Sequence, residues 1–329
     1  MKVTNKTVNY TMGILLILIA ILIFVLFFIN DESTNISANK PKHHFYFIGQ
    51  NQVDPYWKNI RKGIEDASNK YNVVFEYNSP RFTNSDEETM FLDIAISSNV
   101  DGIIANGVNT DKFTELIREA FYKQIPIITI ENDNKNSKRS TFVGANSYLL
   151  GEEAGRLMAK ATKGKANIAI IVNNDNNKNS INHNLRINGF LSIIKNYKNM
   201  EVVDIYTSEL GILSAEEITQ SIINDKNIDA IYTTNTVDTI GSAQLIVDLN
   251  KVEKIKLIGY GDTDEIARYI EKGIIYGTVM SDPYKIGYES VKTLLDIKEN
   301  NRVTTFIDTG IEVITKENLS EYKDIIKVN

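Results

Sequence analysis

The chain of 329 residues contains no cysteine, three histidines and a single tryptophan. Without cysteine there are no disulfides, thiol nucleophiles or thiolate metal sites, and no lipidated cysteine can anchor the chain to a membrane. His43 and His44 stand together and His183 stands alone. A nucleophile–histidine–acid set therefore has little to draw on.

Several functional motifs are also missing. The chain has no G-x-S-x-G elbow, no P-loop and no Rossmann glycine triplet. The formal net charge of -6 argues against a nucleic-acid partner, which would need clustered Lys and Arg. No acidic residue or further histidine lies at ligand spacing from His43 and His44, so neither a metal nor a cofactor is expected. These absences favour a binding protein over an enzyme, although two carboxylates for glycoside hydrolysis leave a sugar-processing enzyme as a remote alternative.

One apolar run dominates the N-terminus. Residues 12–29 carry no charge, and at 1.5 Å per residue they would span roughly 27 Å, close to the thickness of a bilayer core. Lys2 and Lys6 precede the run, whereas Asp31 and Glu32 follow it. The charge bias predicts a cytoplasmic segment 1–11, a transmembrane anchor 12–29, a polar tether 30–42 and an extracellular C-terminal part in a single-pass membrane protein. A cleaved signal segment is the alternative.

From Phe45 onward, segments typical of strands and of helices alternate with short connections. This order predicts an α/β protein whose parallel sheets carry helices on both faces, and its recurrence in both halves predicts two similar doubly wound lobes. The strands are expected at 45–48, 73–77, 102–105, 125–130, 141–143, 168–172, 202–206, 230–233, 256–260 and 278–280, and the helices at 57–67, 87–97, 111–123, 149–161, 184–197, 215–223, 239–249, 264–272 and 284–297.

Polar and aromatic side chains gather where ligands of such sheets bind, beyond the carboxyl ends of the strands. The stretch 50–57 joins two aromatics to short polar side chains at a turn that leads into a helix. Amides and carboxylates match the hydroxyls of a polyol, and aromatic rings cover the C–H faces of a sugar. The candidate ligand-binding residues are Gln50, Asp54, Tyr56, Trp57, Asn106, Glu131, Asn132, Arg186, Asn235 and Asp262.

Each of these residue types also has a purely structural explanation. Tyr56 and Trp57 begin an amphipathic helix and are equally suited to the core. Asp54 precedes a proline where a helix N-cap belongs. Arg186, taken alone, is most often a surface ion-pair partner. The asparagines that close two strands are also common turn residues.

The chain resembles the type I periplasmic sugar-binding proteins, a group that includes ribose- and galactose-binding proteins and the effector domains of LacI-type repressors. The resemblance extends in order from Phe45 to Asn318, and the helix-turn-helix of a repressor has no counterpart before it. The runs that carry it are Asp54-Pro55-Tyr56-Trp57, Lys62-Gly63-Ile64-Glu65-Asp66-Ala67, Asp101-Gly102-Ile103-Ile104, Ile125-Pro126-Ile127-Ile128-Thr129-Ile130, Arg186-Ile187-Asn188-Gly189-Phe190, Asp282-Pro283-Tyr284 and Ile307-Asp308-Thr309-Gly310.

The resemblance implies two lobes joined by three hinge strands that close over a monosaccharide. Lobe 1 would comprise residues 43–145 and 282–306, and lobe 2 residues 146–281 and 307–329. The family's ligand contacts would fall on Gln50, Asp54, Tyr56, Trp57, Asn106, Glu131, Asn132, Arg186 and Asn235.

The chain departs from the family pattern at four places. Thr236 stands where an aspartate usually follows the asparagine of lobe 2, and Ser281 replaces a late hinge glutamine. The usual Gly-Phe-Asp becomes Gly-Tyr-Gly-Asp at 259–262, and Glu131 with Asn132 replaces the Asp-Arg of ribose binders. These changes are compatible with a sugar-sized polar site but argue against ribose.

The sequence therefore predicts a membrane-anchored, extracytoplasmic solute-binding protein that captures a small carbohydrate by hinge closure, without catalysis. One expected partner is an ABC-type sugar permease, to which the sugar would be delivered. The alternative is a sensor histidine kinase in the membrane, whose outer domain would bind the closed form.

Overall fold

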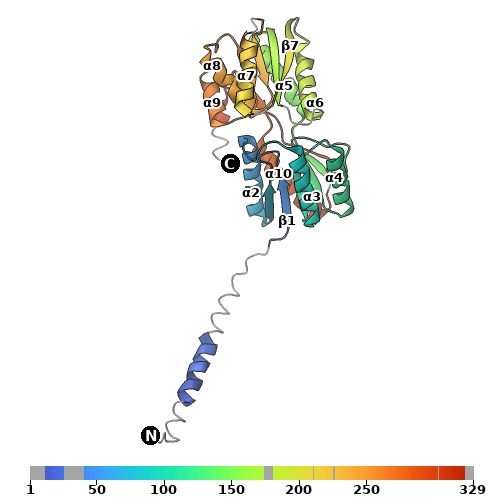
Figure 1. Cartoon of the computed structure of the whole chain (residues 1–329), viewed down its shortest axis with the longest axis vertical. Helices are drawn as coiled ribbons and strands as arrows, with labels where there is room; N and C mark the ends of the chain where they lie inside the picture. The colour runs from blue at the N-terminus through green and yellow to red at the C-terminus, as the bar shows by residue number, and fades with distance from the viewer. Residues whose placement is uncertain are drawn as a thin grey trace. The chain divides into compact units, whose positions relative to one another are not determined.

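The computed structural model describes residues 12–25, 41–173, 181–209, 211–224, 227–302 and 304–322. It separates into two units, Met1–Lys42 and His43–Asn329 (Figure 1). In the first unit, residues 12–25 form a helix whose apolar side chains are exposed.

Within the described ranges, no helix combines the length and the hydropathy that crossing a bilayer requires. Residues 26–29, which complete the predicted anchor, lie outside the described part of the chain, as do the predicted N-terminal segment 1–11 and most of the tether. The membrane anchor therefore stays a prediction.

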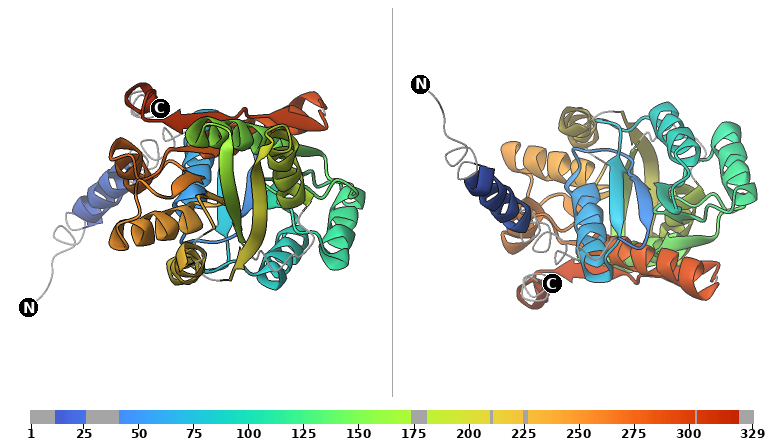
Figure 2. Two further views of the ribbon diagram at one scale, coloured as in Figure 1. Left: turned by 90° about the horizontal axis from the view of Figure 1, so that it is seen from above. Right: turned by 90° about the horizontal axis from the view of Figure 1, so that it is seen from below.

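The second unit is built on two six-stranded sheets (Figures 1 and 2). The first sheet has the order β11-β5-β4-β3-β1-β2. Its strands are β1 (His44–Ile48), β2 (Val74–Asn78), β3 (Gly102–Asn106), β4 (Ile127–Ile130), β5 (Thr141–Gly144) and β11 (Phe306–Asp308), and its helices are α2 (Pro55–Tyr71), α3 (Ser85–Ser97), α4 (Asp111–Tyr122) and α10 (Pro283–Asn300).

The second sheet has the order β12-β10-β9-β8-β6-β7. Its strands are β6 (Lys165–Asn173), β7 (Asn199–Ser208), β8 (Ala230–Thr233), β9 (Lys256–Gly259), β10 (Gly277–Met280) and β12 (Glu312–Thr315), and its helices are α5 (Ser147–Thr162), α6 (Ile181–Ile194), α7 (Gly211–Asn224), α8 (Thr236–Asp248) and α9 (Asp264–Glu271). Neighbouring strands run parallel except for β12, which is antiparallel to β10.

Side-chain alternation along β1 explains why the first sheet needs helices on both faces. Phe45 and Phe47 join the core cluster that contains α2 and α10, whereas Tyr46 and Ile48 join the cluster that contains α3 and α4. A strand buried on both faces is typical of a parallel sheet. The prediction of doubly wound parallel-sheet lobes is confirmed.

Each lobe contains a close contact between two helices that depends on glycine. A Cβ at Gly63 of α2 would lie 2.1 Å from the carbonyl oxygen of Tyr284 in α10. In the second lobe, a Cβ at Gly151 of α5 would lie 1.9 Å from the carbonyl oxygen of Arg186 in α6. Because no side chain fits at these positions, glycine lets the two helices of each pair approach backbone to backbone.

The chain passes between the sheets three times: after β5, after β10 and between β11 and β12. The sequence predicts residues 307 and 308 in lobe 2, but they lie in β11, which pairs with β5 of the first sheet (Ile307 with Val143). The short strands β11 and β12 themselves are not among the predicted strands. Their pairing partners lie far away in the sequence, so local periodicity carries no signal for them.

Candidate ligand-binding site

Five side chains from separate parts of the fold meet between the two lobes, and we call them the inter-lobe cluster. Tyr56 opens α2, Glu131 follows β4, Arg186 lies in α6, Tyr260 follows β9 and Ser281 follows β10. All except the partly buried Glu131 are less than a tenth exposed. All of them except Arg186 lie at the end of a strand or the start of a helix, and ligands of open α/β sheets bind beyond the carboxyl ends of strands.

Glu131 is the common acceptor of the inter-lobe cluster. The Tyr56 hydroxyl donates a hydrogen bond to its Oε1 atom, and Ser281 Oγ donates another at 3.1 Å. Ser281 Oγ also lies 2.7 Å from the Tyr56 hydroxyl and 2.9 Å from that of Tyr260. Glu131 itself has a left-handed backbone with φ of 57°. Non-glycine residues seldom adopt this conformation, and it clusters at binding and active sites.

Arg186 supplies the positive charge. Its guanidinium carbon lies 4.8 Å from the centre of the Tyr260 ring, and its Nη1 donates to the carbonyl oxygen of Thr234 at 2.7 Å. The ring of Tyr260 in turn lies 5.6 Å from that of Tyr56 in the other lobe. Stacking on an aromatic face and one backbone hydrogen bond hold the guanidinium in a fixed orientation.

The charges of Glu131 and Arg186 have opposite signs, so the net charge of the inter-lobe cluster is close to zero when both are ionised. Burial raises the pKa of Glu131, while the Tyr56 hydrogen bond and the charge of Arg186 act to lower it. Burial and the neighbouring Glu131 raise the pKa values of Tyr56 and Tyr260 well above the ordinary range, so both stay protonated. One carboxylate beside one guanidinium suits an uncharged ligand that both donates and accepts hydrogen bonds.

The raised pKa of Glu131 leads to a prediction for Glu131→Gln. Because the folded protein holds this proton more tightly than the unfolded chain, folding stability falls as the pH rises from about 4.5 through the raised pKa. Glutamine keeps an acceptor oxygen but has no proton to lose. The melting temperature of the variant minus that of the wild type should therefore increase with pH across this window in thermal unfolding experiments.

A difference between the two melting temperatures that stays constant from pH 4.5 to pH 8 would contradict the burial of the Glu131 carboxyl. Asp262 and Glu312, whose pKa values are also raised, are unchanged in both proteins and cancel in the difference.

Trp57 and Gln50 lie beside the cluster. Trp57 Nε1 donates to Gln50 Oε1 at 3.2 Å, and the indole packs 6.2 Å from the Tyr56 ring and 6.5 Å from the Phe47 ring. Trp57 is only 5% exposed. It is therefore part of the core of lobe 1, and a stacking role toward a ligand stays a prediction.

The amide residues of lobe 1 form a chain that leads inward. Asn132 Nδ2 donates to Asn106 Oδ1 at 3.1 Å, and Asn106 Nδ2 donates to Glu88 Oε2 at 2.8 Å. Asn106 and Glu88 are both buried, whereas Asn132 is partly exposed. Of the two predicted amides, Asn132 is thus the one nearer the surface, and Asn106 orients it from behind.

Three predicted residues make hydrogen bonds outside the inter-lobe cluster. Asp54 caps α2 by accepting from the Tyr56 amide at 2.9 Å, and Asn235 caps α8 by accepting from the Asp238 amide at 2.8 Å. Asp262 accepts from the hydroxyl of Tyr322 at 3.0 Å. Asp54 and Asn235 thus act as helix caps, and Asp262 is a partly buried acid. Ligand contact by these three residues stays a prediction.

The residues of the inter-lobe cluster that the sequence predictions missed are Tyr260 and Ser281. Tyr260 and Ser281 stand at departures from the family pattern, and that was the signal available for them.

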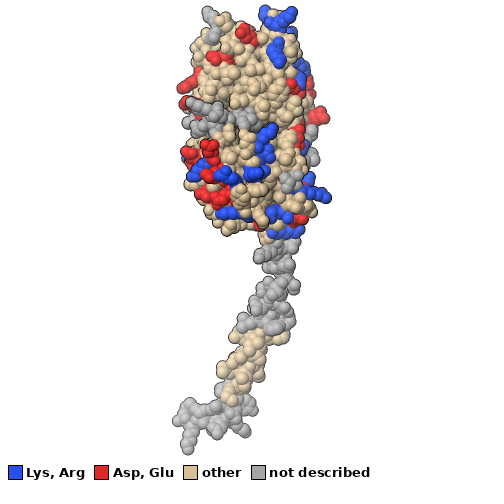
Figure 3. Space-filling model, turned by 90° about the vertical axis from the view of Figure 1, so that its right-hand side faces the viewer, with Lys and Arg blue, Asp and Glu red and all other residues tan. Residues whose placement is uncertain are grey.

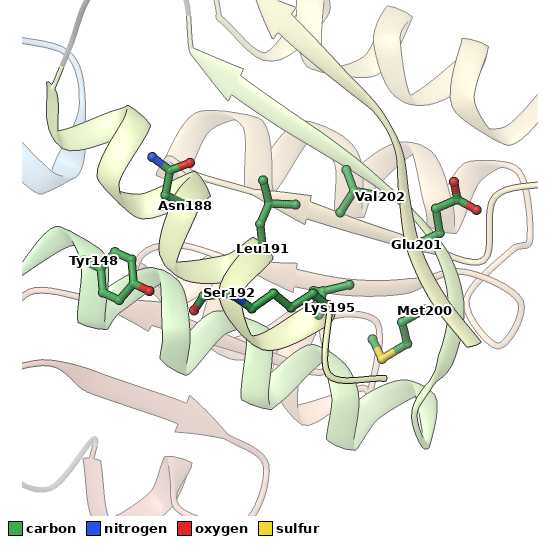
Figure 4. A pocket seen from close by; sticks show the side chains of 9 residues that line it. Tyr148, Asn188, Leu191, Ser192, Lys195, Met200, Glu201 and Val202 are labelled. Atoms are coloured by element: carbon green, nitrogen blue, oxygen red, sulfur yellow. The ribbon is translucent and has the colours of Figure 1, made fainter. Parts of the chain in front are cut away.

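A groove in the second lobe is a competing site. Its volume is about 480 Å³, and it is lined by Tyr148, Asn188, Leu191, Ser192, Ile194, Lys195, Met200, Glu201 and Val202 from α5, α6 and β7. Figure 4 shows Tyr148 and Asn188 at one end and Met200 with Glu201 at the other. Much of the second lobe is uncharged on the face seen in Figure 3. The groove contains none of the predicted residues, and the two charged residues of its lining, Lys195 and Glu201, are both exposed.

The model of the periplasmic binding protein domain matches residues 45–302. The chain belongs to the periplasmic binding protein family. This confirms the resemblance noted from the sequence runs. Among the relatives of this periplasmic binding protein is the D-allose-binding periplasmic protein of Escherichia coli (strain K12), which is 22% identical over 260 residues, covering 76% of this chain and 83% of that protein.

Two solved structures extend the comparison. GanP, a glucose-galactose binding protein from Geobacillus stearothermophilus, is 33% identical with a TM-score of 0.79, and the match covers 84% of this chain and 98% of that one. A chain of a XylFII-LytSN complex is 31% identical with a TM-score of 0.77 and the same coverage. This periplasmic binding protein therefore shares its fold with both over nearly their whole length.

Proposed function

We propose that the protein is an extracytoplasmic solute-binding protein that captures a small, uncharged sugar between its two lobes. The observation that carries the proposal is the inter-lobe cluster, in which buried Arg186 and partly buried Glu131 lie among aromatic rings contributed by both lobes. Relatives named for binding D-allose or glucose and galactose support the ligand class. Aromatic faces would cover the sugar's C–H groups, and the charged pair would hold its hydroxyls.

Binding would work by closure. Tyr56 of lobe 1 contacts Tyr260 of lobe 2, and it also contacts Ser281 in a segment that passes between the lobes. A bound sugar could replace these contacts between side chains with its own. A ligand that prefers the closed form shifts the population toward it by its differential affinity for the two states. Closure would thereby convert occupancy into a surface that a partner protein recognises.

The partner we propose is an ABC-type sugar permease, which agrees with relatives described as import binding proteins. A second candidate is a membrane sensor histidine kinase. Similarity to a chain of the XylFII-LytSN complex favours it, because that structure contains a member of this fold bound to another protein. Anchoring through residues 12–29 would suit either partner.

Calorimetric titration with a panel of pentoses, hexoses and furanoses tests the proposal. We expect saturable heat from one or a few neutral sugars, with the sugar recovered unchanged. No heat from any sugar would refute the proposal, and turnover of a bound sugar would favour the remote enzyme alternative. Co-purification from membranes, with and without the sugar, would distinguish a permease from a kinase.

A further inference from the structure

Two buried polar atoms near the inter-lobe cluster have no hydrogen-bond partner within the described ranges. They are Nε of Arg186 and the hydroxyl oxygen of Tyr232. Arg186 is 7% exposed and Tyr232 is 1% exposed. Buried donors are nearly always paired with protein, water or ligand, so each unpaired one calls for an explanation.

The two atoms belong to neighbouring elements. The Tyr232 ring stacks on Phe190 of α6 with centroids 4.7 Å apart, and Arg186 lies one turn earlier on that helix. Arg186 Nη1 bonds to Thr234, two residues beyond Tyr232 on the same chain segment. Burial raises the pKa of Tyr232 to about 12 although the charge of Arg186 acts to lower it, which also indicates proximity. The two groups therefore lie between α6 and the carboxyl end of β8.

The geometry points to a subsite in which Arg186 Nε and the Tyr232 hydroxyl together hold one acceptor oxygen of the bound sugar. The subsite rests on the proposed function, because it assigns a ligand group within the same site. An arginine N–H can only donate, and a tyrosine hydroxyl is free to donate, so the oxygen must accept. Glu131 accepts from its side of the cluster, so the ligand must also present a donating hydroxyl.

Tyr232 is then a specificity-determining residue. A site built to bond a particular oxygen rejects the analogue that lacks it, because its buried donors stay unpaired. The ligand class that follows is a neutral sugar with an acceptor oxygen toward lobe 2 and a donor hydroxyl toward Glu131. A deoxy sugar without that acceptor oxygen should bind more weakly than its parent.

The test is Tyr232→Phe, titrated with the sugar that the wild type binds and with its monodeoxy analogues. We expect about a tenfold loss of affinity for the parent sugar, the usual effect of one such hydrogen bond. The loss should vanish for the one analogue that lacks the held oxygen. The melting temperature without sugar should stay the same or rise, because the variant no longer buries an unpartnered hydroxyl. Tyr276→Phe, at a partly buried tyrosine packed on the core of the same lobe, is the matched control and should leave affinity unchanged.

Two results would overturn the subsite. If the variant binds the parent sugar as the wild type does and melts earlier, the hydroxyl holds a buried water only. If affinity falls equally for all analogues, Tyr232 shapes the site without contacting a particular oxygen. Both results leave the proposed function intact, whereas wild-type protein that binds no sugar would refute that function and the subsite with it.

Discussion

Replacing Arg186 with methionine is expected to weaken sugar binding by about a hundredfold. The variant loses charge-assisted hydrogen bonds to the ligand, each worth about 1.5–3 kcal/mol, and leaves the Glu131 carboxyl without its nearby cation. Arg186→Lys should recover only part of the affinity, because an ammonium group reproduces neither the planar fork nor the stacking on Tyr260. Calorimetric titration of the three proteins with one sugar measures the effect.

The control for this prediction is Arg156→Met. Arg156 is exposed on α5, where it pairs with Glu152 and Glu153 at the surface, and its loss should change affinity by less than twofold. Should Arg186→Met bind the sugar within about twofold of the wild type while only its unfolding temperature drops, Arg186 would be a structural residue.

The substitution Gly151→Ala is expected to impair both stability and binding, although Gly151 itself belongs to a helix–helix contact. The added Cβ would lie 1.9 Å from the carbonyl oxygen of Arg186, so α5 and α6 must move apart. Overpacking of this kind costs about 3 kcal/mol of unfolding free energy. Because the displaced carbonyl belongs to Arg186, the guanidinium should also lose its position, and affinity should fall by about tenfold.

Urea unfolding and titration of the same preparation measure both effects. The matched variant is Arg156→Ala, which also introduces alanine on α5 but at an exposed position, and it should change neither quantity appreciably. If Gly151→Ala keeps wild-type affinity despite lower stability, the position of Arg186 does not depend on the α5–α6 contact.

Most of the fold was predictable because most of its helices and strands carry a local sequence signal. A continuous apolar run marks β1, and apolar residues at steps of three and four mark α2, whose N-cap Asp54 and following proline define its start. The pairing of β11 with β5 joins residues 164 positions apart, such as Phe306 and Phe142, and the antiparallel strand β12 pairs with β10 on the far side of α10 and β11. Local spacing cannot reveal such pairings, which explains the misplaced end of lobe 1.

The site was predictable only in part, for the same reason. The stretch 50–57 identified Tyr56 and the strand ends identified Glu131, while the family pattern strengthened the prediction of Arg186. The contacts of Glu131 and Tyr56 with Ser281 join residues 150 and 225 positions apart, and they follow from how the lobes meet. Its position after a predicted strand suggested Asp262 as a ligand contact, which stays a prediction; in the structure its carboxyl accepts a hydrogen bond from Tyr322, while Tyr260 provides the ring beside Arg186.

A crystal structure of the protein with its bound sugar tests the central claim most directly. We predict the sugar between Tyr56 and Tyr260, with Arg186 donating to one of its oxygens and Glu131 accepting from one of its hydroxyls. A sugar found instead in the groove formed by α5, α6 and β7, with the contacts of Glu131 to Tyr56 and Ser281 unchanged, would contradict the account.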